Sequence, residues 1–216
     1  MNEKSIPRRA LIRAWGAAAV TTLPAAAFAA GRQQLVKGPA SGPLLQVALV
    51  PCPDYGLENL ATAIQAGWRS SRPPDVRGKR VVLKPNIADF SAERPIHTDP
   101  RLIESLILQL KKLEAREIIL AEGPPHNRDT EWLFRKSGFE ALAKRQSVPL
   151  VDRNYDDVSP VKCVNPRATL LKELYVPRTI LSADVIISVP KMKTHRHAGI
   201  TLSMKNMFGI LPGMKY

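Results

Sequence analysis

The sequence predicts an α/β protein built on a mostly parallel sheet with helices on both faces. Short apolar runs typical of buried strands alternate along the chain with segments whose apolar residues recur at helical spacing. Proline or polar residues end most of these runs abruptly, as expected where a buried strand emerges at the edge of a sheet. The chain has 216 residues, 44% of them hydrophobic, which is enough for one packed domain of ordinary size.

The first 29 residues have the composition of an export signal. A basic segment with Arg8 and Arg9 precedes an Ala-rich apolar stretch, and Ala27-Phe28-Ala29 fits a small-x-small cleavage site. The apolar stretch is too short for a stable membrane span. The arginine pair resembles a twin-arginine signal, with an ordinary secretory signal as the alternative. We therefore expect a periplasmic or otherwise exported protein that uses the twin-arginine export machinery, a linker at residues 30–43, and an α/β domain at residues 44–216.

The first half of that domain alternates strands and helices. Residues 44–50 are predicted to form a strand closed by Pro51, and a helix follows from Gly56 to the segment beginning at Arg72. Residues 79–84 form the second predicted strand, which Pro85 ends. Residues 86–98 are a connection longer than most, so they form either a binding segment or an irregular loop.

The next predicted helix has the clearest start signal in the chain. Asp99 is expected to cap it, with Pro100 at the first helical position, and apolar residues line one face as far as Leu113. A strand at 117–122 and a helix at 130–145 follow, the helix containing the breaker Ser137-Gly138. A short strand is predicted at 148–152.

The last third is less regular. Residues 153–175 are predicted to be irregular, with one short strand at 172–176, and a short helix is expected at 178–182. The apolar residues 185–189 then predict a buried strand that Pro190 ends. Residues 199–208 have helical spacing, and Gly209 is the expected stop.

The composition restricts the class of ligand. The net charge is +13, and residues 1–29 hold four basic residues against one acidic residue, so the remainder keeps +10. Lys and Arg are scattered and only 6% of residues are aromatic, which disfavours nucleic-acid binding. Attraction to small anions or to a membrane surface explains the charge equally well.

Polar side chains gather where the predicted strands end. Every histidine falls in a segment that follows a strand: His97, His126, His195 and His197. Parallel strands bring their carboxyl ends to one edge of the sheet, which is where α/β proteins bind ligands. This coincidence places the candidate site at that edge.

The segment after Pro190 supplies most of the positive charge. If it stays extended, Lys191, Lys193, His195 and His197 share one side, where an anion would relieve their repulsion. A helix beginning near Gly199 would add the positive end of its dipole. The alternative is a solvated basic loop.

A metal site and a reactive thiol are both weakly indicated. His195 and His197 could bind a metal with Glu122, Asp184 or His126, but no third ligand lies at motif spacing and the nearby lysines oppose a cation. We therefore assign no metal ligands. Two cysteines, Cys52 and Cys163, cannot hold an iron–sulfur cluster, although they could pair in an oxidising compartment.

Five segments together resemble a known family. They are KPN at 84–86, HTDP at 97–100, EG at 122–123, VPKMKTH at 189–195 and TLSMKNMFG at 201–209. The chain from about Val47 onward resembles the domain-of-unknown-function family numbered 362, for which no general reaction is established. The resemblance implies a longer protein, so we expect the domain to be incomplete at its C-terminus. Some members carry iron–sulfur modules, but this chain lacks that cysteine-rich part.

We predict an exported enzyme domain that binds a small anionic substrate or cofactor, a carboxylate or phosphate, using Lys and His acid–base chemistry. His195 and Lys193 are the predicted catalytic residues. The predicted ligand-binding residues are Lys84, Asn86, His97, Thr98, Glu122, Lys191, Thr201, Lys205 and Asn206. The alternatives are a non-catalytic exported binding protein or a partner of an iron–sulfur redox system. No particular cofactor is indicated.

Overall fold

A computed structural model describes residues 46–125, 127–162 and 172–212. Its centre is a four-stranded parallel sheet with the strand order β3-β2-β1-β6. The strands are β1 (Arg80–Lys84), β2 (Glu117–Glu122), β3 (Leu150–Asp152) and β6 (Val185–Ser188). The prediction of an α/β fold with a parallel sheet is confirmed, and the central pair β1 and β2 is buried along almost its whole length.

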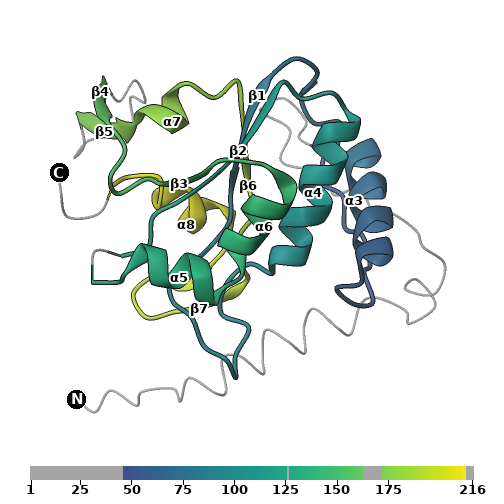
Figure 1. Ribbon diagram of the computed structural model, residues 1–216, viewed down its shortest axis with the longest axis horizontal. Coiled ribbons are helices and arrows are strands. Elements are labelled where there is room, and N and C mark those ends of the chain that lie inside the picture. The colour runs from purple at the N-terminus through teal and green to yellow at the C-terminus, as the bar shows by residue number, and fades with distance from the viewer. Residues whose placement is uncertain (1–45, 126, 163–171, 213–216) are drawn as a thin grey trace, which may run out of the picture.

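Helices cover one face of the sheet in a thick layer (Figure 1). The layer consists of α3 (Leu57–Ser71), α4 (Pro100–Lys112), α5 (Thr130–Lys136) and α6 (Phe139–Gln146). Val81 and Leu83 of β1 point into this side and pack against Ile103 and Ile107 of α4. Alternation along a strand directs Val82 to the opposite face.

The second face has a thinner cover. Val82 belongs to a smaller cluster with Val176 and Ile180, which come from β5 (Glu173–Pro177) and α7 (Arg178–Leu181). β5 pairs antiparallel with β4 (Val158–Lys162). A second hairpin, of β7 (Lys193–His195) and β8 (Gly199–Thr201), leads into α8 (Ser203–Phe208). No helix in the described ranges is long and apolar enough to cross a bilayer.

Most predicted elements lie where the sequence placed them. Asp99 caps α4 by accepting a hydrogen bond from the backbone N–H of Arg101, as its position before Pro100 predicted. The connection after β1 has no helix or strand until α4 begins.

Four predictions were wrong in detail. Residues 46–50 form no strand because no neighbour pairs with them, and Val47 and Leu49 are exposed; residues 44 and 45 lie outside the described part. Gly138, with φ of 80°, divides the predicted helix 130–145 into α5 and α6. β4 was missed within the region predicted to be irregular. Gly199 to Thr201 form a strand, so α8 begins at Ser203 and no helix N-terminus lies near Gly199.

Candidate functional site

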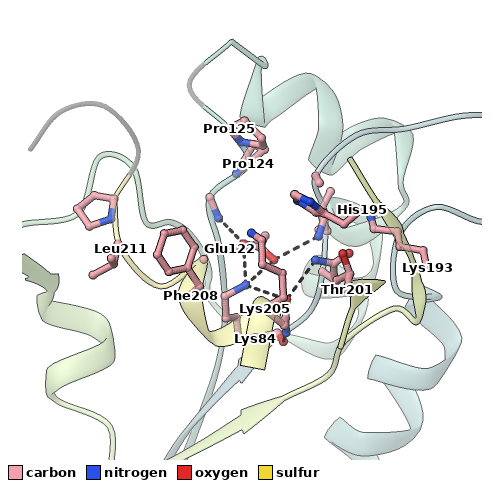
Figure 2. Close-up of a pocket in the computed structure, with 17 residues that line it drawn as sticks. Lys84, Glu122, Pro124, Pro125, Lys193, His195, Thr201, Lys205, Phe208 and Leu211 are labelled. Atoms are coloured by element: carbon pink, nitrogen blue, oxygen red, sulfur yellow. Dashed lines mark hydrogen bonds and ion pairs between the residues drawn. The ribbon is translucent and has the colours of Figure 1, made fainter. Parts of the chain in front are cut away.

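A cavity of about 450 Å³ opens at the carboxyl ends of the parallel strands (Figure 2). This volume is in the range of small-molecule sites. Five parts of the chain line it: the end of β1, the end of β2, the β7–β8 hairpin, α8, and the residues that follow α8. The end of β6 lies beside β1 and sends the chain into the hairpin, which is how the C-terminal segment reaches this edge of the sheet.

A buried ionic cluster forms the floor. Lys84 Nζ lies 3.1 and 3.0 Å from the two carboxylate oxygens of Glu122, and both side chains are almost fully buried. Arg153, with no exposed surface, donates from Nη2 to Glu122 Oε1 at 3.0 Å. The backbone N–H groups of Ile87 and Gly123 also donate to this carboxylate. One carboxylate therefore faces two cations, and the cluster keeps a net positive charge.

Two asparagines have orientations that the cluster determines. Lys84 Nζ can only donate, so Asn206 must turn Oδ1 toward it, at 3.2 Å. Asn206 Nδ2 then donates to Ser188 Oγ and to the Lys84 carbonyl. Asn86 Nδ2 donates to the same Asn206 Oδ1, also at 3.2 Å. Asn206 thus connects β1, β6 and α8, and it fixes the amide of Asn86 beside the cavity.

Lys84 and Lys193 both lose hydration at the site. Burial lowers the pKa of Lys84, and the attraction of Glu122 only partly opposes this effect. Burial also lowers the pKa of Lys193, whose Nζ donates to the Ile96 carbonyl at 2.5 Å. Both side chains therefore hold a proton less firmly than an exposed lysine does.

His195 is fixed in one neutral form by the turn that follows it. Its Nδ1 accepts hydrogen bonds from the backbone N–H groups of His197 and Ala198, at 3.1 and 3.0 Å. A nitrogen that accepts cannot carry the proton, so the neutral ring is protonated at Nε2. Burial, followed by the charge of Lys205, lowers the pKa of His195. The ring that Figure 2 shows beside the cavity is thus a neutral hydrogen-bond donor.

Lys205 comes from α8, with its Nζ 5.0 Å from the centre of the Phe208 ring. No carboxylate in the described part of the chain lies within ion-pair distance of Lys205. Lys84, Lys193 and Lys205 line the cavity, and Glu122 is the only acidic side chain among its described lining residues. The cavity consequently has a positive local charge.

The residue pattern of the family described as "Domain of unknown function (DUF362)" matches residues 81–216. The chain belongs to the DUF362 family. The match begins in β1, later than the residue 47 expected from the sequence motifs, and it includes every side chain of the cavity named above.

One curated relative is similar to this DUF362 chain. It is the thylakoid-associated protein sll1697 of Synechocystis, 24% identical over 139 residues. The aligned region covers 63% of this chain and 40% of the relative, so the chain spans well under half the length of that protein. No solved structure matches the chain.

The cavity brings together eight of the eleven residues predicted from sequence to form the site. They are Lys84, Asn86, Glu122, Lys193, His195, Thr201, Lys205 and Asn206. They come from four separate parts of the chain and meet because the parallel strands end at one edge. Their roles in binding or catalysis stay predictions.

The other three predicted residues do not line this cavity. Thr98 is buried beneath it, where its Oγ accepts from the Asn86 N–H and donates to the Val189 carbonyl. His97 and Lys191 line a separate hollow of about 360 Å³ beside Tyr55. The expectation that Lys191 and His197 share a side with Lys193 and His195 at one site is wrong, because the chain turns after His195 and Lys191 lies against Tyr55.

Arg153 is the component that sequence reasoning missed. It is the first residue after β3, so the rule that placed Lys84 and Lys193 at strand ends could have identified it. Its Nη2 also donates to the Gly123 carbonyl, at 3.0 Å, which ties β3 to the end of β2. Its contribution is therefore to hold Glu122 in place from behind the cavity.

Metal and thiol chemistry find little support among the described residues. They contain no group of three or more His, Cys, Asp or Glu side chains placed to hold a metal ion. Cys52 is exposed, and its Sγ donates to the Asp54 carbonyl at 3.1 Å. Cys163 and His126 lie outside the described ranges, so pairing of the two cysteines and a ligand role for His126 stay predictions.

Proposed function

We propose that the cavity binds a small anionic molecule, a carboxylate or a phosphate, and that the protein acts on it as an enzyme domain. The observation that carries this proposal is the imbalance of charge: three lysines line the cavity against one carboxylate, and that carboxylate is already shared with Lys84 and Arg153. Lys193 and Lys205 have no carboxylate within ion-pair distance among the described residues, so an incoming anion can pair with them.

The donors around the cavity suit the oxygens of such a group. Lys205 and Lys193 carry ammonium groups, and His195 adds an Nε2–H that does not depend on protonation of the ring. Charge-assisted hydrogen bonds from such donors are the strong ones in recognition of carboxylates and phosphates. In a partly enclosed cavity they are screened less than on an open surface.

Lys193 and His195 are the residues proposed to act on the bound molecule. Burial lowers the pKa of Lys193, so its ammonium group can pass a proton to a bound molecule more readily than an exposed lysine can. His195 donates a hydrogen bond to that molecule from Nε2. Proton transfer by His195 needs either the charged ring or the opposite tautomer, and each would lose the two backbone hydrogen bonds at Nδ1, so the geometry favours the role of a hydrogen-bond donor.

Calorimetric titration of the full chain with inorganic phosphate and with propionate tests the binding. Lys205→Gln should weaken binding of the preferred anion about tenfold, the loss expected for one hydrogen bond to a charged group. Arg77→Gln is the matched control, since Arg77 is an exposed cation that precedes β1 at the opposite edge of the sheet. If neither anion binds, or if both variants lose affinity equally, the proposal is wrong.

The alternative is a non-catalytic binding protein that needs the same cations. Lys193→Arg separates the two functions because arginine keeps a cation of similar reach but cannot transfer a proton. The enzyme hypothesis predicts retained affinity and lost turnover of any anion that the wild-type chain converts. A bound anion that the wild-type chain leaves unchanged favours the alternative.

We also propose export through the twin-arginine route, which the composition of residues 1–29 supports. A fluorescent reporter that folds before export, fused behind these residues, should leave the cytoplasm. Arg8→Lys with Arg9→Lys should stop it, and Arg13→Lys is the matched control. Continued export of the double variant would contradict the proposal.

A further inference from the structure

The β7–β8 hairpin has two faces of different character. Its register pairs Lys193 with Thr201 and Thr194 with Ile200, so alternate side chains point to opposite sides. Lys193, His195 and Thr201 face the cavity. The other side of the hairpin faces solvent and is independent of the proposed anion site.

Large apolar side chains dominate that solvent side. Met192 is 73% exposed, Ile200 49% and Leu202 43%, and Met204, two residues further along, is 90% exposed. We call these four residues the outer apolar surface. Isolated exposed apolar residues are ordinary, but four within thirteen residues of one hairpin and the start of α8 indicate a contact surface.

The charged side chains of residues 185–216 have one sign. This stretch contains no Asp or Glu, and of its cations Lys193 and Lys205 line the cavity whereas Arg196 lies in the hairpin turn. Arg196 is exposed in the turn between the strands, and no carboxylate of the described residues lies within ion-pair distance of it. A complementary partner therefore offers apolar material together with negative charge.

A bilayer containing anionic lipids has both properties. Apolar side chains enter the boundary between headgroups and acyl chains, and Lys and Arg bind the lipid phosphates. Pairing of two copies through the same surface is disfavoured because it would bring the cations of both chains together without an acidic residue between them. We infer that the outer apolar surface and Arg196 dock the protein on an anionic membrane surface.

Sedimentation of the full chain with sucrose-loaded vesicles tests this inference. Vesicles of phosphatidylcholine and phosphatidylglycerol in a ratio of about three to one should bind the protein at least about fivefold better than phosphatidylcholine alone. Raising the salt from about 0.1 to about 0.5 M should release it, because screening weakens the cationic contacts.

The apolar N-terminal stretch is another part of the chain that can bind vesicles, and every version of the full chain contains it. Two variants of the hairpin region therefore test the outer apolar surface by itself. Combined Ile200→Ser, Leu202→Ser and Met204→Ser should reduce binding at least about fivefold, and Arg196→Glu should reduce it independently. Leu108→Ser, at an exposed site on α4, is the matched control and should bind like the wild type. All changes are at exposed positions, and thermal melting checks the fold.

Three outcomes would overturn the inference. One is equal binding of the wild-type chain and both variants, which would assign vesicle binding to another part of the chain. Another is absence of binding to either vesicle. The third is a concentration-dependent dimer of the wild type that the triple serine variant loses, which would make the surface an interface between copies. Anion titration of the same variants should be unchanged, so failure here would leave the proposed function untouched.

Discussion

Glu122 is the residue on which the charge balance of the site depends. Its carboxylate accepts hydrogen bonds from Lys84, Arg153 and two backbone N–H groups, and all three side chains are almost fully buried. Removing one partner of a buried pair costs more than the pair contributes, because the remaining charge stays buried without compensation. The same carboxylate prevents the two buried cations from repelling each other and leaves the lysines of the cavity wall available to a ligand.

Glu122→Gln should therefore lower the free energy of unfolding by about 3–5 kcal/mol, since Lys84 and Arg153 would both lose their charged partner. Urea denaturation followed by circular dichroism measures the change. Glu140→Gln is the matched control, because the Glu140–Lys144 pair on α6 is exposed and should contribute almost nothing. If Glu122→Gln lowers the free energy of unfolding as little as the control does, water reaches the floor of the cavity and compensates the charges of Lys84 and Arg153.

The tautomer of His195 is a second prediction at this scale. Nitrogen NMR of the full chain at neutral pH should show Nε2 protonated and Nδ1 unprotonated, because Nδ1 accepts from His197 and Ala198. Protonation of the ring should occur below the ordinary pKa of histidine, since burial and Lys205 both oppose it. A ring protonated at Nδ1, or one titrating above the ordinary value, would contradict the proposed donor role.

At the scale of the elements, the sequence predicted what depends on neighbouring residues. The cap of α4 by Asp99, the buried strands β1 and β2, the partly buried strand β6, and the polar side chains at the strand ends all follow from local patterns. Prediction from the sequence failed where pairing with another strand decides whether a segment becomes a strand. Residues 46–50 have an apolar pattern but no partner, β4 becomes a strand by pairing with β5, and residues 199–201 become one by pairing with β7. The position of Arg153 after β3 was predictable, but its contacts with Glu122 and Gly123 come from the neighbouring strand and no local pattern indicates them.

Substitution of two glycines by alanine should change the stability of the protein in opposite directions. Gly138 separates α5 from α6 with a φ of 80°, which a side chain disfavours, so Gly138→Ala should destabilise the protein by about 1–2 kcal/mol. Gly67 lies inside α3, where a new Cβ would contact only Val50 Cγ2 at 3.7 Å. Gly67→Ala should therefore stabilise by about 0.5–1 kcal/mol. Thermal melting compares them, and a shift of both variants in the same direction would contradict the assigned backbone geometry.

In the described part of the molecule, the candidate site lies at the carboxyl ends of the parallel strands and apolar clusters cover the two faces of the sheet. The response of the protein to pH should reflect that arrangement, because burial lowers the pKa of several groups at the carboxyl edge of the sheet. Burial lowers the pKa of His97, and nearby Asp99 opposes the effect only partly. His195 and Lys193 shift in the same direction.

The stability of the protein should fall as the pH decreases from about 7 to about 5. His97 and His195 have a lower pKa in the folded chain than the ordinary value of about 6.5, so the unfolded chain binds more protons in this range. Glu104 acts at lower pH, because its hydrogen bond to Arg145 lowers its pKa; its contribution is complete above the ordinary pKa of glutamate and is lost as the pH falls through the lowered value. The urea concentration at the midpoint of unfolding should decrease as the pH is lowered across this range. His97→Gln should make that decrease smaller, because glutamine does not titrate. An unchanged slope in that variant would show that the hollow beside Tyr55 is open enough for His97 to be protonated in the folded state. The loss of hydration at this edge of the sheet would then be confined to the cavity at the strand ends.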